Sequence, residues 1–207
     1  MAIIDYYFTS ASPFTYIGHR LICEVAEKHK AELRFKPVNL GSIWEVSGAV
    51  PPAKRAPVRQ HLRMIELQRL AAFRGVKINV QPKFFPVDAS IADRVVIALI
   101  EAGHDPRYFM GKVFAGVWAN EENIADEAVL ASYLSQTGND PVPALEDARQ
   151  PWTAEIRDRN AREAVAAHAV GVPTYVLNGE PFFGQDRIEL LDHALTNGRA
   201  PYRSPLA

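Results

Sequence analysis

The sequence of 207 residues contains a single cysteine, Cys23, and almost no net charge, with 23 basic against 24 acidic side chains. One thiol cannot form an intramolecular disulfide or a cysteine-based metal cluster, which favours a reducing, cytoplasmic setting. The charge balance gives no electrostatic reason to expect nucleic acid or an anionic membrane as a partner. The six histidines lack metal-ligand spacing with one another, so we expect no metal site.

Long hydrophobic runs are also absent. No apolar stretch approaches the roughly 20 residues of a membrane span. The N-terminal MAIIDYYF has neither the basic segment nor the small-residue cleavage site of a secretory signal. With 48% hydrophobic residues, the chain is expected to be a soluble globular protein that buries a substantial core.

The beginning of the chain follows a strand–helix–strand pattern. Residues 2–8 (AIIDYYF) are mostly β-branched or aromatic and predict a buried strand. Ser12-Pro13 predicts a helix start, because serine is a favoured N-cap and proline a favoured first helical residue. Leu33 and Phe35 predict a second strand, so the pattern indicates an α/β unit.

The middle of the chain is different in character. A proline-bearing loop at 48–57 precedes a helix that runs from Pro57 to near Gly75, and residues 81–86 are irregular. The other segments with helical periodicity are 89–103, 107–120, 126–137 and 152–170. The middle is therefore predicted to be all helical.

The C-terminal part returns to strands. After Gly171, VPTYVLNGEPFF predicts two short strands joined by a turn at Asn178-Gly179, and residues 184–198 predict a closing amphipathic helix. The order β-α-β, helices, β-β-α is the thioredoxin topology with a helical insertion. We predict an α/β protein with a thioredoxin-like domain from 1–41 and 167–207. An inserted all-helical domain spans 42–166 in this prediction.

Two segments carry a family resemblance. DYYFTSASPFTY (5–16) is similar to the opening strand and active-site turn of 2-hydroxychromene-2-carboxylate isomerases and kappa-class glutathione transferases, and GVPTYVLNGEPFFGQDRIELL (171–191) is similar to their closing module. These families belong to the DsbA-like branch of the thioredoxin fold. The resemblance implies a glutathione-binding enzyme.

Ser12 has two interpretations. From the residues alone it is a helix cap. In a thioredoxin fold, however, this turn normally holds a nucleophilic cysteine, because a helix N-terminus favours a thiolate. Ser12 brings no sulfur and has no evident base. The resemblance implies that its hydroxyl is catalytic and donates a hydrogen bond to the thiolate of bound glutathione. The two roles are compatible.

The closing module contains the other expected glutathione contacts. Proline at the first residue of a strand is common, but in a thioredoxin fold the proline equivalent to Pro173 is cis. The resemblance implies that the main chain of Val172 pairs with the cysteinyl unit of glutathione. It further implies that Gly184, Gln185, Asp186 and Arg187 hold the γ-glutamyl end. There the N–H groups of Gln185 and Asp186 would meet its carboxylate, and the Asp186 side chain its ammonium.

These residues also have structural interpretations. Asp186 with Glu189 matches a variant of the capping box. Arg187 is equally suited to a structural ion pair.

Contacts to a second substrate are less defined. Lys54 and Arg55 either meet an anionic substrate or the glycyl carboxylate, or are solvated loop charges. Phe84 and Trp118, together with Trp44 and Phe85, either wall an aromatic pocket or belong to the core. Ala49 stands where the related families commonly carry an asparagine that helps hold ligand. This departure bears on the identity of the substrate.

Three functions fit these residues. The first is a glutathione-dependent isomerase resembling 2-hydroxychromene-2-carboxylate isomerase, acting on an aromatic-derived conjugated carboxylate by reversible thiolate addition and bond rotation. The second is a kappa-like glutathione transferase, whose product keeps the sulfur. The third is a redox-inactive thioredoxin-fold binding module. A homodimer is expected by resemblance.

Overall fold

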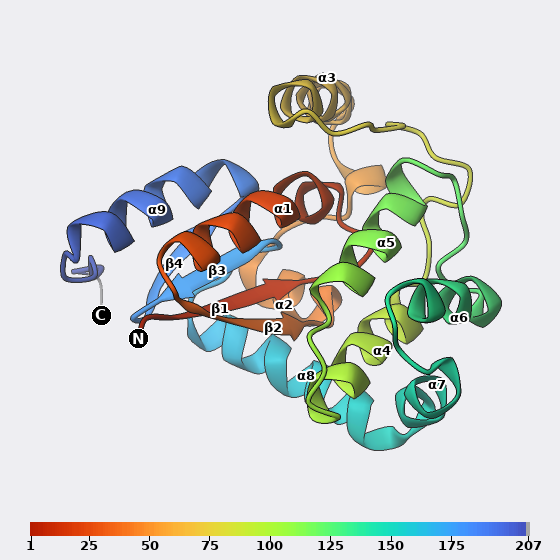
Figure 1. Ribbon diagram of the computed structural model, residues 1–207. Coiled ribbons are helices and arrows are strands. Elements are labelled where there is room, and N and C mark those ends of the chain that lie inside the picture. Colours follow the sequence, from red (N-terminus) through yellow and green to blue (C-terminus); the bar gives the residue numbers. More distant parts are fainter. Residues whose placement is uncertain (206–207) are drawn as a thin grey trace.

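A mixed four-stranded sheet lies at the centre of the computed structural model, which describes residues 1–205 (Figure 1). The strands are β1 (Ile3–Phe8), β2 (Glu32–Pro37), β3 (Thr174–Leu177) and β4 (Glu180–Phe183), in the order β2-β1-β3-β4. β1 pairs in parallel with β2 and antiparallel with β3, and β3 pairs antiparallel with β4. Both positions of the turn between β3 and β4, Asn178 and Gly179, have positive φ, as a type I′ hairpin requires.

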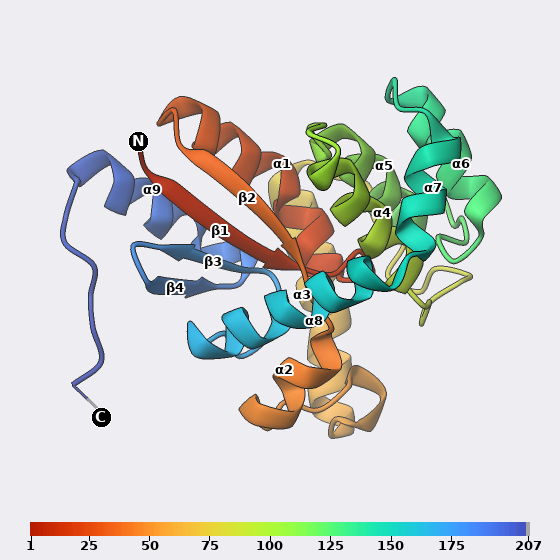
Figure 2. The same cartoon turned by 90° about the horizontal axis from the view of Figure 1, so that it is seen from below.

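Helices cover both faces of the sheet. α1 (Pro13–Lys28) and α9 (Ile188–Asn197), which follows the 3₁₀ turn η2 (Gln185–Arg187), lie on one face, and α8 (Pro151–Ala166) lies on the other (Figure 2). Successive side chains of a strand point to opposite faces. Accordingly Tyr6 belongs to the cluster under α1, and Tyr7 to the cluster under α8.

The remaining helices stand between β2 and β3 in the sequence. They are α2 (Leu40–Ser47), the 3₁₀ turn η1 (Pro52–Lys54), α3 (Pro57–Arg74), α4 (Ser90–Glu101), α5 (Arg107–Trp118), α6 (Glu127–Gln136) and α7 (Pro141–Arg149), followed by α8. Phe109, Phe114 and Trp118 of α5 are fully buried in the same cluster as Tyr6 and Phe8 of β1. The core is therefore continuous from the sheet into the inserted helices.

The predicted thioredoxin-like fold with inserted helices is confirmed. Two helices were missed by the sequence pattern. α2 is short and buries only Ile43, so it shows no apolar periodicity. α7 begins with Pro-Val-Pro, which reads as a loop although proline is tolerated in the first helical turn. The predicted helix at 152–170 starts at Pro151 and ends at Ala166. None of the helices in the described part of the chain is long and apolar enough to span a membrane.

His19 of α1 is a buried histidine in the core. Its side chain faces the ring edge of Phe114, with centroids 5.0 Å apart, and its Nε2 donates to the carbonyl of Arg107 at 2.9 Å. The residue is only 8% exposed. Burial disfavours the charged imidazolium and lowers the pKa of His19 to about 4.

This burial predicts a pH dependence of stability. An unfolded histidine has a pKa of about 6.5. Between that value and the folded pKa of about 4, the unfolded chain binds a proton that the folded chain does not. Stability from neutral His19 is therefore complete above about pH 6.5 and is lost as the pH falls towards 4. In urea unfolding across this pH range, the unfolding free energy of the wild type should fall by up to about 3 kcal/mol more than that of His19→Gln.

The exposed His104 provides a matched control. His104→Gln should retain the wild-type slope of unfolding free energy against pH. Equal slopes for the wild type and His19→Gln would show that His19 is not protonated on unfolding in this window.

Candidate functional site

Ser12 forms the N-cap of α1. Its backbone is extended, Pro13 is the first helical residue, and its Oγ accepts a hydrogen bond from the N–H of Thr15 at 3.2 Å. The residue is 7% exposed. A hydroxyl has one hydrogen to donate in addition to its acceptor lone pairs. Since the capping bond uses only a lone pair, the O–H of Ser12 stays available as a donor.

Ser12 faces a cavity of about 240 Å³. The thioredoxin-like part contributes Thr9, Ala11, Ser12, Pro13, Phe14, Leu40, Val170, Gly171, Val172 and Phe183 to its lining. The inserted segment contributes Trp44, Ala49, Pro52, Arg55, Arg63 and Phe85. The cavity therefore joins the N-terminus of α1 to the inserted helices.

The peptide bond between Val172 and Pro173 is cis, as expected from the fold. Val172 and Ser12 line the same cavity. Neither the N–H nor the carbonyl of Val172 has a hydrogen-bond partner in the described part of the chain. Extended backbone with free polar groups can pair with another extended segment as a strand does. A second cis bond, Phe85–Pro86, follows another lining residue, Phe85, and was not foreseen from the sequence.

Asp93 of α4 anchors the turn that leads to Ser12. The carboxylate is fully buried, accepts hydrogen bonds from Thr9 Oγ1 at 2.9 Å and Ser10 N–H at 2.8 Å, and forms an ion pair with Arg157 at 3.1 Å. Burial raises the pKa of Asp93, and the Arg157 charge opposes that rise. The sequence pattern gave no signal for this residue, because its partners lie far away along the chain.

The segment Gly184–Arg187 does not line the cavity but adjoins it. Phe183 lines the cavity, and the N–H of Gly184 donates to the carbonyl of Pro173 at 2.9 Å. Gly184 has φ of +101°, and a Cβ there would lie 2.5 Å from Asp186 Oδ1. The positive φ is what makes glycine the suitable residue here.

The alternative interpretation of Asp186 and Glu189 as a capping box is not supported by the structure. Asp186 makes no capping hydrogen bond and instead pairs with Arg187 at 2.6 Å, both side chains being about half exposed. Glu189 pairs with Arg74 of α3. Arg74 also donates from Nε to Oε1 of the buried Gln185 at 3.0 Å. The Arg74 guanidinium therefore pairs with the Glu189 carboxylate that a capping box would have used.

The residues expected around a second substrate separate into two groups. Arg55 lines the cavity, whereas its neighbour Lys54 is exposed outside it. Trp118 is fully buried behind Phe85, with ring centroids 4.8 Å apart, and does not reach the cavity.

Phe84 is also absent from the lining and contacts Lys83. Arg63 does line the cavity and was missed. Its i, i+4 spacing from the buried Leu67 and Ala71 was the available signal.

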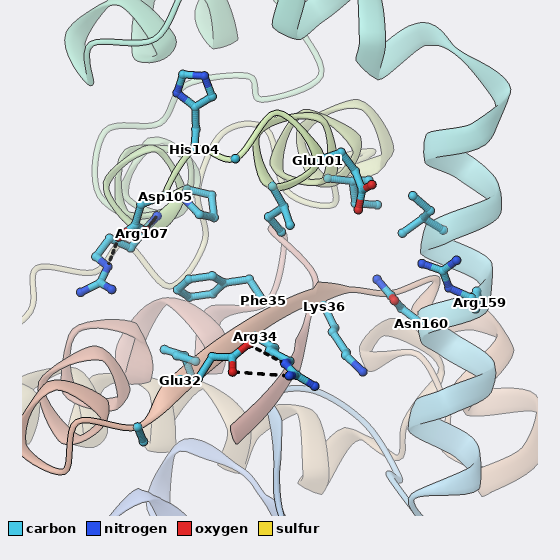
Figure 3. A pocket seen from close by; sticks show the side chains of 17 residues that line it. Glu32, Arg34, Phe35, Lys36, Glu101, His104, Asp105, Arg107, Arg159 and Asn160 are labelled. Carbon is cyan, nitrogen blue, oxygen red and sulfur yellow. Dashed lines mark hydrogen bonds and ion pairs between the residues drawn. The ribbon is translucent and has the colours of Figure 1, made fainter. Parts of the chain in front are cut away.

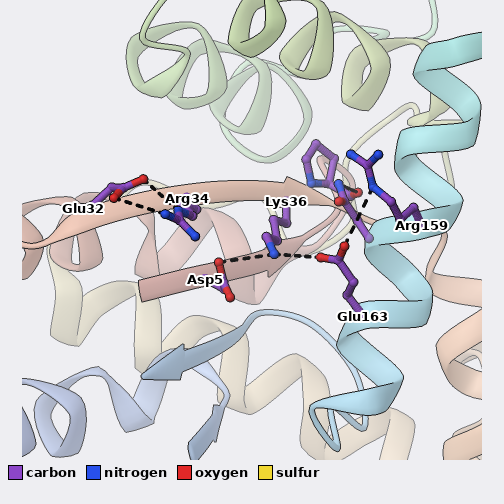
Figure 4. Close-up of polar contacts among 8 residues, drawn as sticks. Asp5, Glu32, Arg34, Lys36, Arg159 and Glu163 are labelled. Atoms are coloured by element: carbon purple, nitrogen blue, oxygen red, sulfur yellow. Dashed lines mark hydrogen bonds and ion pairs between the residues drawn. The ribbon is translucent and has the colours of Figure 1, made fainter. Parts of the chain in front are cut away.

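A larger, more open hollow of about 650 Å³ lies along the free edge of β2, between α8 and the loop before α5 (Figure 3). Most of its charged side chains have charged partners. Arg34 pairs with Glu32, and Lys36 lies between Asp5 and Glu163 (Figure 4). Charges that already have partners need no ligand to balance them. The Ser12 cavity is therefore the better candidate site.

Cys23 lies outside the Ser12 cavity. Burial raises the pKa of its thiol to about 12, so it is protonated at neutral pH and is a poor nucleophile. Any thiolate chemistry at Ser12 therefore needs a sulfur from a ligand.

Comparison with known proteins identifies the family. The model of the DsbA-like thioredoxin domain matches residues 3–196, so the chain belongs to the DsbA-like thioredoxin family. It is 26% identical over 198 residues to a 2-hydroxychromene-2-carboxylate isomerase of Pseudomonas putida, covering 93% of this chain and 94% of that protein. It is also 26% identical over 200 residues to glutathione S-transferase kappa 1 of Caenorhabditis elegans, covering 91% and 88%.

A solved structure gives the same result for the fold. A 2-hydroxychromene-2-carboxylate isomerase superposes with a TM-score of 0.80 at 22% identity, covering 94% of this chain and 95% of that one. The resemblance seen in residues 5–16 and 171–191 is confirmed by these relatives.

The anchoring role of Asp93 predicts a large loss of stability when it is neutralised. Asp93→Asn leaves the mostly covered Arg157 without its carboxylate, and breaking a buried pair from one side costs about 3–5 kcal/mol. Arg157→Met combined with Asp93→Asn should cost less than the sum of the two single changes. Urea unfolding measures all three variants.

The control is Glu101→Gln, which removes an exposed carboxylate at the other end of the same helix. Its unfolding free energy should stay within about 0.5 kcal/mol of the wild type. If Asp93→Asn behaved like Glu101→Gln, the anchoring role would be refuted.

Proposed function

We propose that this protein is a glutathione-dependent isomerase acting on an aromatic-derived conjugated carboxylate. The observation that carries the proposal is the pairing, in one cavity, of a donor hydroxyl at a helix N-terminus with the unpaired main chain of Val172. A thioredoxin-fold oxidoreductase would need a reactive cysteine at this turn. The turn carries Ser12 instead.

The residues present fit glutathione. Val172 offers a free N–H and carbonyl for the cysteinyl unit, and Ser12 lies in the same cavity for the sulfur. Beyond Phe183, Asp186 offers an exposed carboxylate for the γ-glutamyl ammonium, which would replace its present partner Arg187. The N–H groups of Gln185 and Asp186 are assigned to the γ-glutamyl carboxylate.

When bound, glutathione would supply a thiolate that adds reversibly to a conjugated double bond, which becomes a single bond that can rotate before the thiolate leaves and the double bond re-forms. The role of Ser12 is to donate its O–H to the sulfur. Among the described residues, the N–H of Phe14 at this helix end also has no hydrogen-bond partner, and the helix dipole adds partial positive charge. Together these groups favour the charged sulfur over the thiol. The inserted helices would hold the conjugated substrate against it.

A kappa-like glutathione transferase is the second candidate, favoured by the similarity to glutathione S-transferase kappa 1. The two activities differ in stoichiometry, because an isomerase regenerates glutathione and a transferase consumes it. Thiol titration during turnover of a panel of conjugated aromatic carboxylates separates them. We also propose a cytoplasmic location, from the single cysteine, and a homodimer, from the family resemblance.

The first test of this proposal concerns Ser12. If the hydroxyl holds the thiolate, Ser12→Ala should raise the pKa of bound glutathione, because the charged form loses a hydrogen bond. Ultraviolet thiolate absorbance against pH, with glutathione saturating, measures this in wild type and variant. Loss of the cap alone should cost about 0.5–2 kcal/mol of stability.

Thr15→Val is a matched control, because the Thr15 main-chain N–H donates the capping hydrogen bond to Ser12 and Thr15 does not line the cavity. It should leave the thiolate pKa unchanged. An unaltered thiolate pKa in Ser12→Ala would reduce Ser12 to a cap and remove the mechanism.

The second test concerns Asp186. Asp186→Ala should weaken glutathione binding on the order of ten- to a hundredfold, since a hydrogen bond to a charged group contributes about 1.5–3 kcal/mol. The exposed side chain makes no capping bond, so the melting temperature should barely move. Glu189→Gln removes a nearby carboxylate that pairs with Arg74 and should keep wild-type affinity. Calorimetric titration showing equal affinities for wild type and Asp186→Ala would exclude the assigned contact.

A further inference from the structure

Arg63 of α3 is a covered cation without a counter-ion. The residue is 8% exposed, lines the Ser12 cavity, and has no hydrogen bond or ion pair in the described part of the chain. Its one recorded contact is with the ring of Phe85, 5.8 Å from the guanidinium carbon to the ring centroid. Burial and the neighbouring Arg55 lower its pKa. A buried charge left unpaired opposes folding.

Other mostly covered arginines form ion pairs with carboxylates. Arg74 pairs with Glu189, Arg107 with Glu27 and Asp105, and Arg157 with Asp93. Against that pattern, the missing partner of Arg63 is specific to this cavity.

The cavity as a whole is positively charged. Arg55 lines it as well and uses its Nε on the carbonyl of Val50 at 2.7 Å. No aspartate or glutamate is found among the described residues that line it. Two guanidinium groups and a helix N-terminus thus face one space with no carboxylate to balance them. An anionic ligand is the partner that such a site fits.

The position of Arg63 in the cavity indicates which part of a bound ligand it would contact. Ser12, Val172 and Phe183 belong to the thioredoxin-like part, and the glutathione proposed above extends from them towards Asp186. Arg63 of α3 and Phe85 of the loop before α4 belong to the inserted segment that forms the rest of the cavity lining. The fork of a guanidinium matches a carboxylate bidentately, and an aromatic ring beside it suits a planar conjugated chain.

We propose that Arg63, supported by Arg55, binds the carboxylate of the second substrate, a conjugated aromatic acid, at the insert end of the Ser12 cavity. Arg63 thereby selects acids over their neutral analogues. The identity of the bound acid as a substrate rests on the proposed function, whereas the anion site itself does not.

The test uses the full chain without glutathione and trans-cinnamate as the probe, with the neutral trans-cinnamamide beside it. Calorimetric titration should show that the wild type prefers cinnamate. Arg63→Met should lose cinnamate affinity on the order of ten- to a hundredfold, the effect of removing a charge-assisted hydrogen bond. Binding of cinnamamide should be little changed. Arg63→Lys keeps the charge without the forked guanidinium, so its cinnamate affinity should lie between those of the wild type and Arg63→Met.

A control and a stability measurement accompany the titration. Arg59→Met removes an exposed charge of the same helix outside the cavity and should bind cinnamate as the wild type does. Without ligand, Arg63→Met should melt at a higher temperature than the wild type, because an unpaired buried cation is replaced by an apolar side chain that packs on Phe85. Saturating cinnamate should reduce or reverse that difference.

The outcomes separate this inference from the proposed function. Cinnamate binding that depends on Arg63 in a protein that does not bind glutathione would keep the anion site and refute the isomerase. Loss of glutathione affinity in Arg63→Met, with cinnamate affinity unchanged, would assign Arg63 to a carboxylate of glutathione and overturn the inference. Equal affinity of wild type and Arg63→Met for cinnamate overturns it as well.

Discussion

The carboxylate of Asp93 is the interaction on which the candidate site depends. It is fully buried, and it joins the turn of Thr9 and Ser10 to Arg157 of α8. The turn connects the central strand β1 to Ser12. One group from the inserted helices therefore fixes where the N-terminus of α1 stands relative to the rest of the cavity wall. Burying a charge is costly unless it is fully paired, so the insert and the turn are stable only together.

The electrostatics of the cavity supports the proposal that Ser12 acts at a turn where the fold normally carries a cysteine. The cavity combines a helix N-terminus, the O–H of Ser12 and the guanidinium groups of Arg55 and Arg63. Each of these favours a negative charge on a bound group. The chain's own thiol, Cys23, sits in surroundings that keep it protonated. The cavity thus has a positive electrostatic potential that favours an anion, and the anion has to come from a bound ligand.

The sequence was most informative where structure is local. Ser12-Pro13 predicted a helix start and Asn178-Gly179 a hairpin turn, because each depends on a few adjacent residues. The cis bond at Val172-Pro173 was expected from the fold resemblance. Asp93 and Arg63 were not foreseen.

These two residues depend on partners distant in the sequence. Asp93 acts on Ser10, 83 residues away, and a buried arginine on a helix looks like any solvated one until its surroundings are known. The failed capping box at Asp186 has the same cause. Arg74, from a helix far along the chain, takes Glu189 and Gln185 instead.

The two candidate activities share the thioredoxin end of the cavity, so the inserted helices must decide between them. In the proposed function, Ser12 and Val172 would hold a bound sulfur in the same way whether the product keeps it or releases it. The two activities would differ in how the second substrate is held while its double bond is altered. A carboxylate bound by Arg63, as inferred above, would anchor one end of the conjugated chain beside Phe85 while the bond rotates. The inserted segment, which supplies Arg63 and Phe85, is therefore where the two activities would diverge.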